Sequence, residues 1–308
     1  MITNLISSHK QLITLSYKTK KQKLLKFLFP YYPLRWRYST YLIIFLAALI
    51  SLRFLTQIFS IPIGPVLRIS FNWIPTSLIG WMFGPVLAIP LGIIIDSITF
   101  FWSGGVWFWM YAIQEPLIMC LSGIIGGIYQ FRKEFKNWIW DYLFLQIIFL
   151  FFVSIAIIAL LTFASNKFEN TNLDFIGLSR MDTVYLSISV IVIFFVSIQV
   201  IIHLLLYYKK IYQKQLILFI YVILLVFLLS IIFSFILGTI SAINFYKYIS
   251  GDNSLSPNFL IYGSYYYLIP RVIKEIFKAP LLIIILVNLV KLSNSYLIKI
   301  QQLSYQKW

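Results

Sequence analysis

The chain has 308 residues, of which 61% are hydrophobic and 11% are charged, and its mean hydropathy is +0.89. This composition excludes a water-soluble domain and is typical of a polytopic membrane protein. The net charge of +16 is accompanied by no nucleic-acid-binding motif, and the single cysteine, Cys120, excludes both a disulfide framework and a cysteine-based metal site.

The N-terminal segment is basic. Its first 40 residues contain eight Lys or Arg and no acid. They lack the apolar core and small-residue cleavage site of a signal peptide. We therefore predict a basic cytoplasmic tail over 1–40, in which 24–36 either lies along the lipid headgroups or is unstructured.

Several stretches are long and apolar enough to cross about 30 Å of hydrocarbon as a single helix. In chain order they are 41–59, 107–129, 138–164, 183–208, 215–245 and 264–290. The region 68–102 is too long for one span, and Gly84-Pro85 predicts a break into a short helix and a longer one. The sequence thus predicts an all-α polytopic membrane protein with about eight transmembrane helices.

The distribution of Lys and Arg predicts the orientation, because short basic loops stay in the cytoplasm. With the N-terminus inside, the inner segments hold 17 basic residues and the outer loops hold 4. We predict a multi-pass protein of a bacterial cell membrane with both termini cytoplasmic.

Charged residues inside the spans predict a polar site, because each is costly in hydrocarbon. At 1.5 Å per helical residue, Arg53, Asp96, Glu115 and Arg271 each lie about 9–12 Å below the outer end of a span. One interpretation is a polar pocket in the outer half of the membrane. The other is structural: the cations snorkel to headgroups or pair with the acids to hold the bundle together.

The last span carries the densest charge. Arg271, Lys274 and Lys278 share one helix face, and Glu275 is within pairing distance of Arg271 at i+4. The four cations Arg53, Arg271, Lys274 and Lys278 outnumber the three acids Asp96, Glu115 and Glu275 by one positive charge, or by two if Arg68 joins them, which favours an anionic ligand.

No enzyme or ATPase motif is present. The sequence contains no G-x-x-x-x-G-K-[ST] phosphate loop, no H-E-x-x-H and no G-x-S-x-G. We predict neither enzyme activity nor a cofactor, and any ATP drive must come from a partner.

Three motifs in the first half of the chain carry a resemblance to a known family. They are the stretches Leu67-Arg68-Ile69-Ser70-Phe71-Asn72-Trp73-Ile74-Pro75, Gly80-Trp81-Met82-Phe83-Gly84-Pro85 and Gly92-Ile93-Ile94-Ile95-Asp96. Later, Leu121-Ser122-Gly123 with Gly127-Ile128-Tyr129, and Pro270-Arg271-Val272-Ile273-Lys274 with Pro280, agree with them. As a set, they resemble the substrate-binding (S) component of energy-coupling factor (ECF) vitamin transporters, most closely its folate-specific branch.

This resemblance implies a six-helix core, so the two additional spans are interpreted as an inserted hairpin. The implied organisation is the tail 1–40, core helices in 41–130, the inserted hairpin in 131–213, the last two core helices in 214–292 and a cytoplasmic tail in 293–308.

The resemblance also implies partners: a transmembrane coupling subunit and two cytoplasmic ATPase subunits, reached through small residues of the first span. Ala47 and Ser51 have the small-x-x-x-small spacing that allows helices to approach closely, although packing within the bundle explains them equally well. Gly123 and Gly127 repeat this spacing, and we interpret them as internal packing.

We therefore expect a subunit that captures an anionic vitamin, folate in the first instance, from outside the cell. The candidate substrate-binding residues are Arg53, Arg68, Asn72, Asp96, Trp107, Glu115, Arg271 and Lys274. The alternatives are an S component for another vitamin, such as pantothenate or riboflavin, and an ion-coupled secondary transporter that uses Asp96 or Glu115 as a proton relay.

Overall fold

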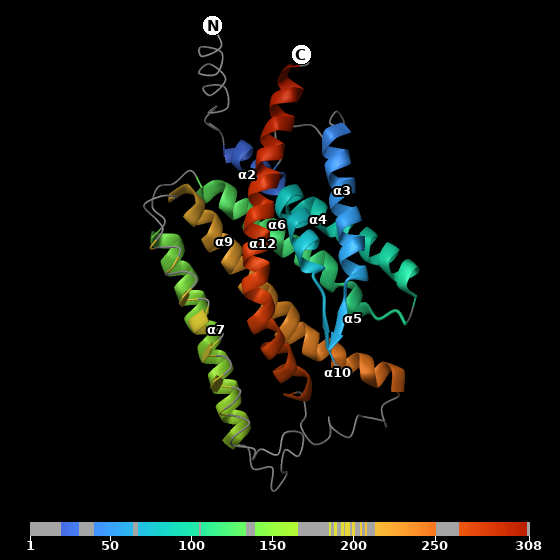
Figure 1. Cartoon of the computed structure of the whole chain (residues 1–308), viewed down its shortest axis with the longest axis vertical. Coiled ribbons are helices and arrows are strands. Elements are labelled where there is room, and N and C mark those ends of the chain that lie inside the picture. Colours follow the sequence, from blue (N-terminus) through green and yellow to red (C-terminus); the bar gives the residue numbers. More distant parts are fainter. Residues whose placement is uncertain are drawn as a thin grey trace.

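The protein folds as a bundle of long helices (Figure 1). The computed structural model describes residues 20–30, 40–63, 67–104, 106–133, 139–165, individual positions between 185 and 207, 213–250 and 265–306. Five helices of this described part are long and apolar enough to cross a membrane. This confirms the prediction of an all-α polytopic membrane protein.

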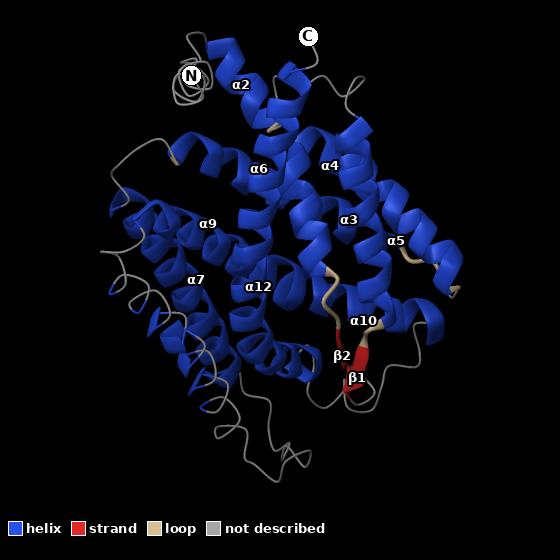
Figure 2. Cartoon of the chain, turned by 45° about the horizontal axis from the view of Figure 1, so that its top comes forward, coloured by secondary structure: helices blue, strands red, loops and turns tan. Residues whose placement is uncertain are grey.

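A small hairpin is the exception to the helical fold. β1 (Ile61–Ile63) and β2 (Leu67–Ile69) pair antiparallel, with Pro62 opposite Arg68. The hairpin lies near α10 (Leu237–Ser250) in both Figure 1 and Figure 2. The expectation that a helix begins near Arg68 is therefore wrong, because this residue belongs to a strand.

The predicted break at Gly84-Pro85 is confirmed. α4 (Trp73–Ser103) contains one non-helical residue, Gly84, with φ 81° and ψ 168°. This conformation is accessible to glycine and strained for other residues. Pro85 follows it and has no N–H to continue the hydrogen bonding of the first half.

The two halves of α4 fold back on each other around α6 (Gln114–Arg132). A Cβ atom at Gly80 would lie 2.1 Å from the Met119 carbonyl oxygen, and one at Gly92 would lie 2.5 Å from the Pro116 Cα. At the turn between them, a Cβ at Gly123 would lie 2.6 Å from the Pro85 nitrogen. From Gly80 to Pro85 the contact on α6 moves from Met119 to Gly123, and from Pro85 to Gly92 it moves back to Pro116. α4 is therefore a helical hairpin, and both of its halves pack against α6. Gly123 packs inside the protein, as predicted.

Part of the basic N-terminal segment is folded against this hairpin. α2 (Lys20–Leu28) places the Leu28 carbonyl oxygen 2.3 Å from where a Cβ of Gly84 would lie. The Phe27 ring stacks on Phe131 and also contacts Gly127. α2 thus covers the turn of α4.

The centre of the bundle is formed by two long helices. α9 (Gln213–Leu229) continues through a π-helical segment, η3 (Ser230–Ile236), into α10 without interruption. α12 (Tyr265–Gln306) crosses it and has 42 residues, which corresponds to about 63 Å at 1.5 Å per residue. α12 extends beyond the end of the span that we predicted at 290. Its C-terminal end lies at the same end of the molecule as α2 (Figure 1).

α7 (Ile139–Ser165) lies beside α9 at the edge of the bundle. It pairs antiparallel with the segment around 195–199: Phe149 contacts Phe195, and Gln146 and Gln199 exchange two hydrogen bonds of 2.9 and 2.6 Å. The stretch that we interpret as an inserted hairpin therefore has an antiparallel contact of its own. Whether it is an insertion remains a prediction.

α3 (Thr40–Ile58) is the span most weakly embedded in the described part of the chain. In its most apolar 18-residue stretch, only 22% is buried inside the protein, against 83% in the corresponding stretch of the continuous helix formed by α9, η3 and α10. Its buried side chains form a single stripe: Leu42, Leu46, Leu49 and Arg53. α3 therefore packs along one line and leaves the rest of its surface exposed.

Candidate functional site

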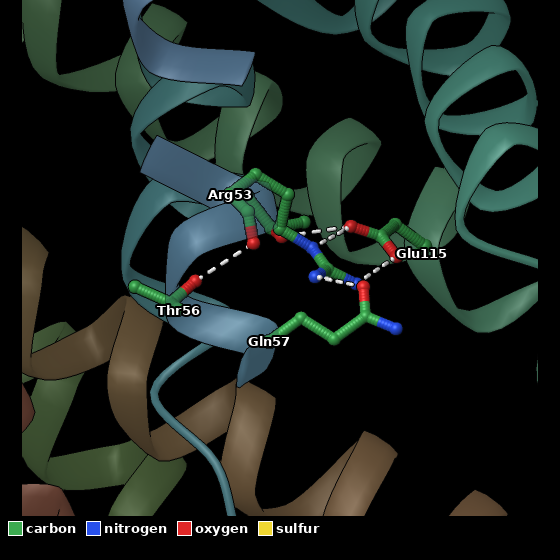
Figure 3. A network of polar contacts seen from close by, with 5 residues as sticks. Arg53, Thr56, Gln57 and Glu115 are labelled. Carbon is green, nitrogen blue, oxygen red and sulfur yellow. Dashed lines mark hydrogen bonds and ion pairs between the residues drawn. The ribbon is translucent and has the colours of Figure 1, made fainter. Parts of the chain in front are cut away.

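A buried ion pair links α3 to α6 (Figure 3). Arg53 donates from Nε to Glu115 Oε1 at 2.5 Å and from Nη2 to Glu115 Oε2 at 2.6 Å. The Thr76 hydroxyl of α4 donates to Glu115 Oε1 at 3.0 Å, and Arg53 also donates to Gln57 Oε1 at 3.3 Å. One carboxylate therefore connects three helices. We call Arg53, Gln57, Thr76 and Glu115 the Glu115 cluster.

Local sequence explains why Glu115 tolerates burial. It lies in the first turn of α6, where the positive end of the helix dipole favours a carboxylate. Pro116 follows and has no N–H that would need a partner at this helix start. The bidentate guanidinium supplies the remaining compensation.

Asp96 lies near the Glu115 cluster without joining it. Its half-buried carboxylate on the second half of α4 is close enough to Glu115 and Arg53 for their charges to interact. It makes no hydrogen bond or ion pair with any residue that the structure describes. Arg53, Asp96 and Glu115 are thus brought together, as their predicted depths implied.

A second buried cluster centres on Glu275 of α12. Ser234 and Ser230 of η3 donate to its two oxygens at 3.1 and 3.3 Å. Lys274 and Lys278 approach Glu275 Oε1 at 3.5 and 3.6 Å. Glu275 is fully buried, and these two lysines leave the cluster with one excess positive charge. We call these five residues the Glu275 cluster.

The first turn of α4 lies between the two clusters. The Lys278 ammonium group lies 3.5 Å from the centre of the Trp73 ring, while Thr76, three residues later, bonds Glu115. Asn72 precedes this turn, and its Oδ1 is buried without a hydrogen-bond partner among the described residues. A buried amide oxygen of this kind can accept a hydrogen bond from a ligand or a water.

Arg271 lies apart from the Glu115 cluster. Its Nη1 donates to the Tyr267 carbonyl oxygen at 2.8 Å, and its side chain packs against Gly238. The predicted pairing of Arg271 with Glu275 is wrong, because the two lysines and two serines occupy that carboxylate instead. From helical spacing alone, Arg271 would be as good a partner for Glu275 as Lys278 is.

The remaining predicted residues are more peripheral. Trp107 precedes the short helix α5 (Trp109–Ala112) and is 54% exposed. Arg68 lies in β2, and Ala47 and Ser51 lie on the exposed face of α3. The Ser51 hydroxyl donates to the Ala47 carbonyl oxygen at 2.9 Å, so it has a partner within its own helix.

Sequence reasoning missed the neutral members of both clusters: Gln57, Thr76, Ser230 and Ser234. A hydroxyl in a span is common, so it gives little signal alone. The i, i+4 spacing of Ser230 and Ser234 on a strongly apolar helix was the available clue.

A further missed group lies at the end of the bundle near α2. Arg132 donates to both oxygens of Asp141 at 2.8 and 3.0 Å, and the Tyr221 hydroxyl donates to the same carboxylate at 2.8 Å. These residues join α6, α7 and α9. We interpret this group as structural, because the Arg132 and Asp141 charges pair with each other and the contacts hold the three helices together.

Metal binding finds no support in the described residues, where no three His, Cys, Asp or Glu side chains gather in a group able to hold an ion.

Comparison with known proteins identifies two bacterial relatives. The chain is 33% identical over 287 residues to the "Uncharacterized protein MG313 homolog" of Mycoplasma pneumoniae, covering 91% of this chain and 100% of the relative. It is 38% identical over 264 residues to the "Uncharacterized protein MG313" of Mycoplasma genitalium, covering 82% of this chain and 90% of the relative. No family model matches the chain, and no solved structure matches it.

Proposed function

This chain belongs to the family of the Mycoplasma protein MG313. We propose that it is the substrate-binding component of an ECF-type ABC importer. It captures an anionic vitamin, folate in the first instance, and has no catalytic activity. Its partners are a transmembrane coupling subunit and two cytoplasmic ATPase subunits. The bacterial origin of the relatives supports a place in a bacterial cell membrane. The excess of Lys and Arg in the predicted inner segments supports cytoplasmic termini.

The observation that carries this proposal is the first turn of α4 between two buried charge clusters. A helix start within a membrane bundle presents the positive end of its dipole and favours an anionic group. Lys274 and Lys278 add a buried positive charge that Glu275 does not neutralise. The unpartnered Asn72 Oδ1 supplies an acceptor for a ligand N–H. A small organic anion with hydrogen-bond donors fits these groups.

The exposed face of α3 supports the proposed partner. Ala47 and Ser51 are exposed on a helix that packs along a single stripe, so a second helix can approach there closely. The sequence resemblance implies that the coupling subunit docks on this face.

Transport tests the proposal. Reconstituted alone in liposomes, the protein is expected to give no uptake of labelled folate. Addition of the coupling subunit, both ATPases and ATP is expected to give uptake that stops with a non-hydrolysable ATP analogue. Saturable uptake by the protein alone under an ion gradient would contradict the proposal.

The partner surface gives a separate prediction. Replacing Ala47 or Ser51 with Trp is expected to abolish copurification with the coupling subunit, because the bulky ring prevents close helix contact. Vitamin binding by the isolated protein should persist. Ala48→Trp, at an exposed position of α3 turned about 100° away from Ala47 around the helix, serves as a control for the added bulk. Unchanged assembly of the Ala47 and Ser51 variants would remove these residues from the interface.

A second candidate, an ion-coupled secondary transporter, is favoured by Asp96. Its half-buried carboxylate makes no ion pair within the described part of the chain, so it is available to bind and release a proton. Glu115 is less suited to this role, because Arg53 and Thr76 occupy its oxygens. Uptake by the protein alone, lost in Asp96→Asn, would favour this candidate.

A further inference from the structure

A cluster of aromatic rings joins α5 to α10 next to Arg271. Phe108, just before α5, lies at its centre, with its ring 5.5 Å from Phe245, 5.6 Å from Tyr248 and 5.8 Å from Tyr111. Tyr111 and Phe245 are 5.3 Å apart. We call these four residues the Phe108 cluster. Phe108 is buried, whereas Tyr248 is 62% exposed and Tyr111 is 39% exposed, so the cluster has a buried base and an accessible rim.

Polar contacts fix the two elements that carry these rings. Gln114 donates to the Ser241 hydroxyl at 3.0 Å, and the Asn244 amide contacts the Met110 sulfur at 3.4 Å. Both contacts join α10 to the start of the α5 and α6 region. The rings are therefore held in place before any ligand arrives, which lowers the entropic cost of binding.

Arg271 supplies a cation beside the rings. Gly238 and Phe245 are seven residues apart and share one face of α10. The Arg271 side chain packs on Gly238, while Phe245 contacts Tyr111. Arg271 also lies within electrostatic reach of the Tyr111 phenol group. The guanidinium is only partly exposed, and among the described residues it donates one hydrogen bond and makes no ion pair.

An interfacial aromatic belt does not account for this arrangement. Belt residues place single rings against headgroups. Here the rings come from two distant parts of the sequence and pack on one another. They lie beside a guanidinium that has no carboxylate partner among the described residues. An aromatic platform next to an unneutralised cation suits a flat ring that bears an anionic group.

We propose that the Phe108 cluster and Arg271 form a binding site for an aromatic anion, in which the ring stacks on Tyr248 and Tyr111 and the anionic group binds the Arg271 guanidinium. This site rests on the proposed function, because it is where the ring of the captured vitamin binds. It adds ring recognition, and a second cation for the anionic groups of the ligand, to the charge recognition at the first turn of α4.

Equilibrium binding to the purified chain in detergent tests the site. Three probes separate ring from charge: folic acid is an aromatic anion, pantothenate is an anion without an aromatic ring, and riboflavin is aromatic with no carboxylate. Saturable binding of folic acid is expected to be at least about tenfold tighter than that of either other probe.

Variants then locate the binding. Arg271→Gln is expected to weaken folic acid binding about 10- to 100-fold, which corresponds to a lost hydrogen bond to a charged group. Tyr248→Leu should weaken it about 3- to 10-fold through lost stacking. Tyr248 is mostly exposed, so its replacement leaves the fold intact. The matched controls on α12, Lys291→Gln and Phe277→Leu, should stay within about twofold of the wild type.

Two results would overturn the site. One is folic acid binding that Lys274→Gln weakens while Arg271→Gln and Tyr248→Leu leave it unchanged; this would keep the anion at the first turn of α4 and remove ring recognition by the Phe108 cluster. The other is pantothenate binding more tightly than folic acid. Conversely, folic acid binding that depends on Arg271 and Tyr248 without ATP-dependent uptake would support the site and contradict the importer.

Discussion

Replacing Glu115 with Gln is expected to lower the free energy of unfolding by about 3–5 kcal/mol, the range for breaking one partner of a buried ion pair. The change leaves the Arg53 guanidinium buried without its hydrogen-bonded counter-charge between α3 and α6. α3 should detach first, because its other buried side chains form only one stripe of leucines. Thermal unfolding of the purified protein in detergent, followed by loss of the monodisperse species, measures the effect.

The matched variants distinguish a charge effect from a packing effect. The double replacement Arg53→Met with Glu115→Leu removes both charges and is expected to recover most of the lost stability, since an apolar pair carries no desolvation penalty. Gln57→Ala removes only the 3.3 Å hydrogen bond and should cost less than about 1.5 kcal/mol. If Glu115→Gln were no worse than Gln57→Ala, the ion pair would not hold α3.

Gly84→Ala is expected to destabilise the fold by about 2–6 kcal/mol. The φ of 81° contributes about 1–3 kcal/mol of backbone strain for a residue with a side chain. Overlap with α2 contributes about 1–3 kcal/mol more, because the new Cβ would lie 2.3 Å from the Leu28 carbonyl oxygen. Expression level and thermal unfolding in detergent both report this loss.

Gly104 offers a matched control for that variant. It also has a positive φ, 64°, but a Cβ there would meet nothing within 4 Å. Gly104→Ala therefore has only the strain contribution, about 1–3 kcal/mol. Equal losses for the two variants would mean that the contact of α2 with the turn of α4 adds no stability.

Depth along a helix was the part of the site that could be predicted from sequence. Arg53, Asp96 and Glu115 lie near one another as expected, because a regular rise of 1.5 Å per residue converts position into depth and Gly84-Pro85 correctly indicated a break. Arg271, to which the same reasoning gave the same depth, lies apart from them. Neither step needs to know how the helices are rotated about their axes.

Rotation and partner choice were the parts that could not be predicted. Glu275 has Arg271, Lys274 and Lys278 within reach on its own helix. Which of them pairs with Glu275 depends on how η3 packs against α12, and the sequence does not show that packing. Likewise, Phe108 and Phe245 are separated by 137 positions, so no local pattern places them together. Arg68 was misassigned because a three-residue strand is too short to show alternation.

The reversal within α4 has a consequence for membrane sidedness. A hydropathy profile shows Trp73–Trp102 as one uninterrupted apolar segment. Counting it as a single crossing would place every later loop of the chain on the wrong face of the bilayer. Because the chain turns back at Gly84, both ends of the segment lie toward the same end of α6, as expected for a segment that returns to the face from which it started. Epitope tags or labelling sites placed just before Trp73 and just after Ser103 are therefore expected to report the same side of the membrane.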